Sequence, residues 1–265
     1  MRIIGIANHK GGVAKTTTAV NLGASIAATG RSVLLIDCDP QASASRWLGF
    51  EPVSDQPMLE HVFSGDASLT ESSYPTTVER LSLVPASPQL AVQDRLLLGK
   101  PAPAAVLLRA LRASPAMPCD YVLLDSPPQL GMLACNVLAA AQELLIPVSP
   151  DPLSVAALDE VFESVKTIRD WVNPDLRILG ILLVRVRTQT LLARKIAAAL
   201  SARHANLILP VQVRETVRVA EAPARHLPLA AHCPGSPADD DYRRLAEFLL
   251  QRESPRRAEE LSAAR

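Results

Sequence analysis

Short apolar runs alternate with stretches of helical periodicity along most of the chain. The apolar runs predict buried strands at residues 2–7, 32–37, 81–85, 121–125, 143–148, 176–186 and 205–209. Apolar residues spaced three or four apart predict helices at residues 16–29, 153–171, 190–203 and 239–252. Continuous apolar strands between helices are typical of a parallel sheet covered on both faces. We therefore expect an α/β fold with a mostly parallel twisted sheet and helices on both faces; residues 51–77 have too weak a period to place.

Length and composition favour one domain. The chain has 265 residues, of which 48% are hydrophobic, which is enough for one large core. We expect the domain to span residues 1–252 and residues 253–265 to form a polar tail. The first apolar stretch is too short for a signal peptide, and no run is long enough for a membrane span, so a cytoplasmic protein with no membrane contact is expected.

Charge and cysteine usage narrow the possibilities further. The formal net charge is zero, so binding to nucleic acid would need a local basic patch. The cysteines are too widely spaced to suggest a disulfide framework or a zinc site, and they predict a reducing compartment. Only five of the 27 basic residues are lysines, and Lys10 and Lys15 share one glycine-rich loop. A compact ammonium suits enclosure by phosphate oxygens better than a planar guanidinium does.

That loop, with the sequence HKGGVAKTT at residues 9–17, lies between the first strand and the first helix. Its glycines let successive backbone N–H groups point inward, and the helix that follows adds its positive end, so the loop is suited to phosphate. Lys15 is expected to reach the β- and γ-phosphates, and the Thr16 hydroxyl is expected to bind Mg²⁺. The nucleotide-binding residues predicted here are Lys10, Gly11, Gly12, Val13, Ala14, Lys15, Thr16 and Thr17.

The loop departs from the common pattern G-x-x-x-x-G-K-[ST]. Ala14 stands where a glycine normally precedes the lysine. If this position needs a positive φ, alanine carries a strain cost and nucleotide affinity is reduced. The first position of the pattern also has no useful glycine.

Carboxylates follow two of the predicted strands. Asp37 and Asp39 end the strand at 32–37, and Asp125 ends the apolar run YVLLD before the turn Ser126-Pro127-Pro128. Carboxylates at the carboxyl ends of parallel strands face the crevice where nucleotides bind. We expect Asp39 to orient water and to lie in the outer shell of Mg²⁺, and Asp125 to lie near the same ion. Asp37 is open to either a site role or a capping role.

The loop with its early lysine resembles the deviant Walker A box of the ParA/MinD family of P-loop ATPases. The resemblance covers residues 2–252 and includes the segment VRVAEAP at 217–223, which is most similar to short ParA proteins that segregate chromosomes and plasmids. It implies ATP and Mg²⁺ as ligands, slow hydrolysis stimulated by a ParB-like partner, and a homodimer that forms on ATP binding. It also implies that Lys10 acts catalytically across the dimer, beside Lys15 and Asp39, and that Asp151 lies near the ribose.

Two other segments depart from the family pattern. The family's Pro-Arg-Asn before Val-Arg is replaced by Arg214-Glu215-Thr216, which puts the adenine contacts in doubt. An acidic or Tyr-Asp element after the strand residues 178–184 is replaced by Arg185, Val186 and Arg187.

The second half of the chain contains a candidate DNA surface. Residues 174–225 hold nine basic residues against three acidic ones, which is a local balance of +6. Aromatic residues are absent from this stretch, so contact with the duplex backbone is favoured over base stacking. The DNA-contacting residues predicted here are Arg187, Arg194, Lys195 and Arg218. Non-specific binding to double-stranded DNA implies a nucleoid-associated protein.

Alternative functions keep the same ATPase core. A MinD-like membrane switch needs a basic amphipathic C-terminal helix, but the helix at 239–252 reads as a core-packing element. An ATPase that positions another cargo has almost the same sequence signature as a partition ATPase. A nitrogenase-reductase-like electron carrier needs cluster-binding cysteines, and neither Cys119 nor Cys135 has the expected glycine-rich setting.

Overall fold

The computed structural model describes residues 1–53, 55–114, 117, 119–187 and 191–253. Within these ranges eight strands form one sheet in the order β3-β4-β2-β5-β1-β6-β7-β8. The strands are β1 (Arg2–Ile6), β2 (Val33–Asp37), β3 (Tyr74–Pro75), β4 (Leu81–Val84), β5 (Tyr121–Asp125), β6 (Glu143–Val148), β7 (Arg177–Val186) and β8 (Ile208–Arg214). All neighbours pair in parallel except the short β3, which is antiparallel to β4.

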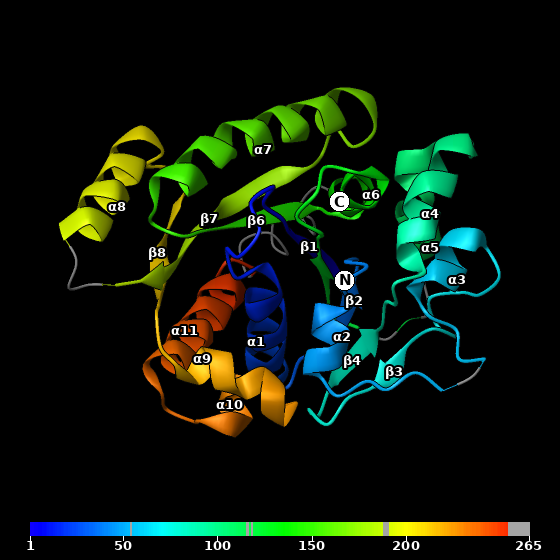
Figure 1. Cartoon of the computed structure of the whole chain (residues 1–265), viewed down its shortest axis with the longest axis horizontal. Helices are drawn as coiled ribbons and strands as arrows, with labels where there is room; N and C mark the ends of the chain where they lie inside the picture. Colours follow the sequence, from blue (N-terminus) through cyan, green and yellow to red (C-terminus); the bar gives the residue numbers. More distant parts are fainter. Residues whose placement is uncertain (54, 115–116, 118, 188–190, 254–265) are drawn as a thin grey trace, which may run out of the picture.

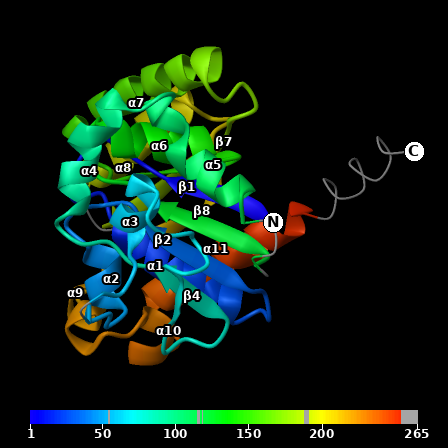
Figure 2. The same cartoon turned by 90° about the vertical axis from the view of Figure 1, so that its right-hand side faces the viewer.

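Helices cover both faces of this sheet, as expected from the sequence (Figures 1 and 2). Figure 1 shows α1 and α11 on one face and α6 and α7 on the other. The α-helices are α1 (Lys15–Ala27), α2 (Ser43–Trp47), α3 (Leu59–Ser64), α4 (Leu90–Leu96), α5 (Val106–Arg112), α6 (Met132–Ala140), α7 (Pro152–Trp171), α8 (Leu191–Arg203), α9 (Arg218–Glu221), α10 (Leu229–His232) and α11 (Pro237–Gln251). Short 3-10 turns are η1 (Leu97–Gly99), η2 (Pro103–Ala105) and η3 (Ala222–Arg225).

The sheet separates two hydrophobic cores. Successive residues of a strand point to opposite faces, and β5 shows this clearly. Val122 and Leu124 belong to the core beneath α6 and α7, whereas Tyr121 and Leu123 belong to the core beneath α1 and α11. Every residue of β1, β2 and β5 is buried, which explains why these strands appear in the sequence as uninterrupted apolar runs.

The C-terminal helix α11 packs as a core element, which confirms the prediction from its periodicity. Tyr242, Leu245 and Leu249 on its inner face are at most 1% exposed. No helix in the described part of the chain is long and apolar enough to cross a membrane. The predicted polar tail at residues 253–265 lies outside the described residues, except for its first residue, Glu253.

The prediction of the last strand was wrong in its position. β8 spans Ile208–Arg214 and includes Pro210, whereas the sequence predicted a strand at residues 205–209. β8 lies at the edge of the sheet, where a proline costs no ladder hydrogen bond on its outer side. Helices α2 to α6, α9 and α10 were not predicted, and the unplaced segment 51–77 contains α3 and β3.

Candidate nucleotide-binding site

The predicted site residues converge at the carboxyl edge of three neighbouring strands. β5 lies between β1 and β2, and its last residue Asp125 is in register with both Ile6 and Asp37. Backbone hydrogen bonds from Ser126 N to Ile6 O (3.2 Å) and from Cys38 N to Asp125 O (2.9 Å) continue this alignment past the strand ends. The glycine-rich loop after β1 and the carboxylates after β2 and β5 are therefore brought together.

The glycine-rich loop has the conformation of a phosphate-binding nest. Gly12 has φ +76° and Ala14 has φ 58° and ψ 34°, so both lie in the left-handed region. Ala14 is the N-terminal flank of α1, and its carbonyl accepts the first helical hydrogen bond from Thr18 N at 2.9 Å. The positive φ of Ala14 confirms that this position has a left-handed backbone conformation. Glycine adopts this conformation without strain, whereas alanine adopts it at a cost in free energy.

Lys15 lies inside the loop rather than in solvent. Its residue is 7% exposed, and its Nζ donates a hydrogen bond to the Lys10 carbonyl at 3.1 Å. Burial lowers the pKa of Lys15, while the nearby carboxylates of Asp125 and Asp39 act in the opposite direction. The ammonium is therefore held beside a nest of backbone donors, as binding to phosphate oxygens requires.

Asp125 is the least satisfied polar group of the site. The residue is fully buried, and neither carboxylate oxygen has a hydrogen-bond partner among the described residues. Burial, reinforced by the charge of Asp37, raises the pKa of Asp125 well above its usual value, and the Thr16 hydroxyl and the Lys15 ammonium only partly offset this. A buried carboxylate without partners fits a cation and its water shell, so the residues at this edge fit Mg²⁺.

Asp37 and Asp39 have different roles in the structure. The Asp37 carboxylate is buried and accepts hydrogen bonds from Ser45 N (2.8 Å) and Ser45 Oγ (2.7 Å), so it anchors the first turn of α2. Burial raises the pKa of Asp37 to about 6. Asp39 is half-buried, lines the pocket and uses one oxygen to accept from Gln41 N at 2.9 Å. The structure supports the capping alternative for Asp37 and leaves Asp39 facing the pocket.

The two lysines of the loop point to different places. Lys10 is not among the residues that line the pocket, and its Nζ forms an ion pair with Asp151 at 2.5 Å. The side chains of this pair are 27% and 38% exposed. The structure therefore places Asp151 against Lys10 within one chain, and the ribose contact predicted for Asp151 stays a prediction.

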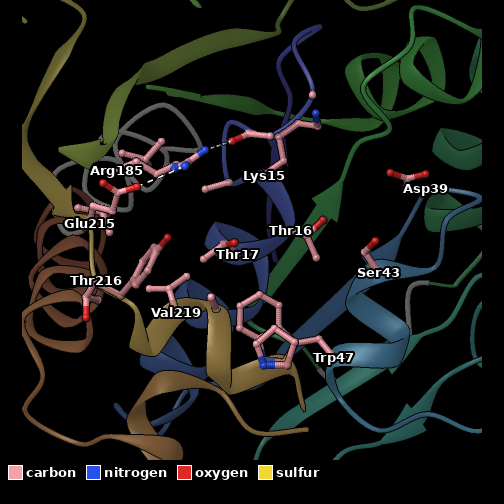
Figure 3. Close-up of a pocket in the computed structure, with 18 of the residues that line it drawn as sticks. Lys15, Thr16, Thr17, Asp39, Ser43, Trp47, Arg185, Glu215, Thr216 and Val219 are labelled. Atoms are coloured by element: carbon pink, nitrogen blue, oxygen red, sulfur yellow. Dashed lines mark hydrogen bonds and ion pairs between the residues drawn. The ribbon is translucent and has the colours of Figure 1, made fainter. Parts of the chain in front are cut away.

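A pocket of about 720 Å³ extends from the phosphate loop to the β7 and β8 ends (Figure 3). Thr16 and Thr17 line it near the loop, and Trp47 and Val219 line it on the far side of Thr17. Trp47 is held in place because its indole N–H donates to the Leu227 carbonyl at 2.9 Å. Trp47 and Val219 give this side of the pocket an apolar wall, which suits an aromatic base.

Arg185 is a pocket residue that the sequence did not predict. Its backbone has φ 54°, and its guanidinium donates to Gly12 O at 3.2 Å and pairs with Glu215 at 3.3 Å. Arg187 pairs with the same carboxylate. Arg185 and Glu215 are both departures from the family pattern, and the structure shows that they contact each other (Figure 3). The signal that could have found them is a pair of departures from the family pattern at the ends of neighbouring strands.

The basic segment is less cationic in the fold than in the sequence. Carboxylates from outside the segment join those within it: Asp159 pairs with Arg203 at 3.0 Å, and Asp241 pairs with Arg214 at 2.8 Å. The local balance of +6 therefore overstates the positive surface. Of the four residues predicted to contact DNA, Arg187 and Arg218 are exposed and ion-paired, Lys195 is exposed, and the side chain of Arg194 lies outside the described part.

Comparisons with known proteins show the family of the chain. Residues 1–178 match the family model described as an AAA domain. The chain is 38% identical to the chromosome-partitioning ATPase Soj of Thermus thermophilus, over 95% of this chain and 96% of that protein. It is 34% identical to the chromosome partitioning protein ParA of Caulobacter vibrioides, over 97% of each. This chain belongs to the ParA/MinD family.

A solved structure shows the same similarity in the fold. Cobyrinic acid a,c-diamide synthase from Mycobacterium smegmatis, in a structure with a bound ATP analogue and magnesium, is 29% identical to the chain. The match covers 96% of each chain with a TM-score of 0.83. The described residues therefore have the P-loop fold of the ParA/MinD family.

Proposed function

We propose that this chain is a partition ATPase that binds ATP with Mg²⁺, closes into a homodimer on double-stranded DNA, and leaves DNA when a ParB-like partner stimulates slow hydrolysis. Near full-length similarity to Soj and ParA proteins supports this proposal. The main observation behind the proposal is that the two lysines of one loop lie in different surroundings. Lys15 is buried beside the phosphate nest, whereas Lys10 lies outside the pocket, where it could reach a nucleotide held by a second copy.

The residues of the pocket suit the chemistry of hydrolysis. The backbone nest and Lys15 are suited to bind phosphate oxygens, and Thr16 and Asp125 would hold a magnesium ion and its water shell. When bound, the ion would neutralise charge on the phosphates. Asp39, half-buried at the pocket edge, is placed to orient the attacking water.

The pair between Lys10 and Asp151 gives a reason for a nucleotide-dependent dimer. Lys10 is held by a carboxylate of its own chain in the monomer. Exchange of that carboxylate for the phosphates of a partner's nucleotide becomes favourable only when a nucleotide is present across the interface. The cost of breaking the pair is small because both side chains are partly exposed.

The test is binding to random-sequence duplex DNA with ATP, with ADP and without nucleotide, repeated across a series of salt concentrations. We expect binding only with ATP, and a steep loss as salt rises because the contacts are to phosphates. Lys10→Ala should stay monomeric with ATP and lose DNA binding while it still binds nucleotide. DNA binding that is equal in all three nucleotide states would contradict the proposal and favour a different cargo.

A further inference from the structure

A cavity lies between α3 and α4, in a part of the chain whose helices the sequence did not predict. Its volume is about 770 Å³, and its walls come from the two helices and from the loops next to them. α3 and α4 lie at the end of the molecule that is far from α8 (Figure 1). No described residue lines both this cavity and the nucleotide pocket. We call this cavity the α3–α4 pocket.

The α3–α4 pocket contains a buried carboxylate that lacks a full set of partners. Glu60 lines the pocket from α3 and is only 5% exposed. Its Oε1 accepts a hydrogen bond from the Ser87 hydroxyl, whereas its Oε2 is buried and has no hydrogen-bond partner among the described residues. Within the described part of the chain, Asp125 is the other residue with such a carboxylate oxygen, and Asp125 fits magnesium. Glu60 is far from that role and needs an explanation of its own.

The groups around Glu60 offer oxygen atoms rather than protons. Gln93 lines the pocket from α4, and its Oε1 is buried without a hydrogen-bond partner in the described structure. The Ser87 hydroxyl lies against Glu60 Oε1 and 2.5 Å from Gln89 Oε1, but a hydroxyl has a single proton to donate. The wall of the pocket therefore has more acceptors than donors, and a ligand with several N–H groups suits it.

The charged groups of the pocket are acidic. Asp55 and Asp66 are exposed and line it, and no Lys or Arg is among its described lining residues. His61 also lines the pocket, but its Nδ1 accepts a hydrogen bond from Met58 N at 3.0 Å, so this nitrogen carries no proton. A buried carboxylate beneath two exposed ones favours a positively charged ligand.

A metal ion is the less suitable cation for this pocket. No group of three or more His, Cys, Asp and Glu side chains in the described part of the chain could hold one. Calcium takes about six to eight oxygen ligands, whereas Glu60 is the one buried carboxylate of the pocket. The walls are also partly apolar, because Val53 and Val92 line the pocket and are 65% and 55% exposed. An aliphatic chain with a charged end matches both kinds of wall.

We propose that the α3–α4 pocket binds a guanidinium group carried on a short aliphatic chain. The planar guanidinium has several N–H donors and is weakly hydrated, so it can serve Glu60 Oε2 and a second acceptor of the wall at once. Its aliphatic chain lies against Val53 and Val92, and the carboxylates of Asp55 and Asp66 attract the cation as it approaches. Such a group belongs either to a small molecule or to an arginine side chain of another protein. The site does not depend on the partition function proposed above.

The test measures the binding of n-butylguanidinium to the full-length protein by isothermal titration calorimetry. n-Butylurea has the same shape without the charge, n-butylammonium has the charge without the planar donors, and calcium chloride tests a metal ion. ADP and Mg²⁺ are present throughout, so that the nucleotide pocket is filled. Glu60→Gln removes the charge and keeps the size of the side chain. Glu51→Gln, at an exposed carboxylate outside the pocket, is the matched control.

We expect n-butylguanidinium to bind wild type and Glu51→Gln equally and to bind Glu60→Gln at least about tenfold more weakly, because a charge-assisted hydrogen bond to a buried carboxylate is lost. Equal binding by wild type and Glu60→Gln overturns the proposal. Equal binding of n-butylurea and n-butylguanidinium by wild type overturns it as well. Tighter binding of n-butylammonium, or calcium binding that needs Glu60, shows that the proposed class of ligand is wrong. Thermal melts identify a Glu60→Gln protein that fails to fold, and the ligand series on wild type decides in that case.

Two further ligands separate the sources of the guanidinium. Agmatine carries the group on a free small molecule, and a Gly-Arg-Gly peptide with blocked ends carries it on a polypeptide. Tighter binding of agmatine supports a small-molecule ligand, and tighter binding of the peptide supports an arginine of another protein. Either result has to be lost in Glu60→Gln. If wild type binds neither of them, the proposal is wrong.

Discussion

The two ends of the nucleotide pocket are built in opposite ways. The phosphate end comes from one continuous loop, whose backbone shape is set by Gly12 and Ala14. The opposite end, which we call the base end because a nucleotide base would lie there, is assembled from α2, β7, β8 and α9, and the Arg185–Glu215 ion pair lies at its rim. A nest formed by the backbone tolerates few substitutions, because its shape depends on φ and ψ. A wall formed by side chains can change when two contacting residues are replaced together. Arg185 and Glu215 are exchanges of the second kind, whereas Ala14 is a departure within the nest itself and keeps its left-handed backbone.

The largest effect should come from the phosphate end. Lys15→Ala removes the one ammonium buried in the nest, so we expect ATP affinity to fall by at least about 100-fold, as for the loss of several charge-assisted hydrogen bonds. Titration with a fluorescent ATP analogue measures this. Lys195→Ala, at an exposed lysine outside the pocket, is the control and should leave the affinity unchanged. If Lys15→Ala kept its affinity for ATP, the phosphate end would not be the end of the pocket that contributes most to nucleotide binding.

Substitution of Asp125 should have opposite effects on the stability of the protein and on its magnesium-dependent binding of ATP. Asp125→Asn removes a buried carboxylate that has no hydrogen-bond partner in the described structure, so the protein without magnesium should become more stable by about 1–2 kcal/mol. Binding of ATP should lose its dependence on Mg²⁺. Denaturant unfolding with and without the ion measures the first effect, and ATP titration in the same buffers measures the second. A less stable apo protein would mean that Asp125 has a structural partner.

Sequence reasoning succeeded where function depends on neighbours along the chain. The loop at 9–17 predicts its own shape, and the apolar runs before Asp37 and Asp125 place these residues at strand ends. The pairing of Asp37 with Ser45 needs the turn between β2 and α2, and burial then raises the pKa of Asp37 to about 6. Arg185 and Glu215 are 30 residues apart and meet only because β7 and β8 are neighbours. Contacts of this second kind depend on strand order, which periodicity does not specify.

The Arg185–Glu215 pair should have a moderate effect on affinity. Arg185→Met removes the tie between the rim and Gly12 O, and we expect ATP affinity to fall a few-fold, because ion pairs at exposed side chains contribute about 0.2–1 kcal/mol. Glu215→Gln should have a similar effect. A double-mutant cycle of the two measures their coupling. Fully additive losses would show that the two departures are independent of each other.

The smallest effect tests the strain at the phosphate end. Ala14→Gly relieves a left-handed alanine, which costs about 1–2 kcal/mol, but glycine also loses about 0.5–1 kcal/mol more backbone entropy on folding. The net change is a gain of between zero and about 1.5 kcal/mol in the free energy of unfolding, measured by urea denaturation. Ala42, with φ 50°, should respond in the same direction.

Ala28 supplies the opposite control for this substitution, because it ends α1 in an ordinary helical conformation with φ −61°. Ala28→Gly should therefore lower the free energy of unfolding by about 0.5–1 kcal/mol. If Ala14→Gly destabilises the protein as much as Ala28→Gly does, the left-handed turn is not strained, and the phosphate end has accommodated alanine without cost. If Ala14→Gly alone stabilises the protein and also tightens ATP binding, then the loop holds its nucleotide-binding shape against a strain that glycine would remove.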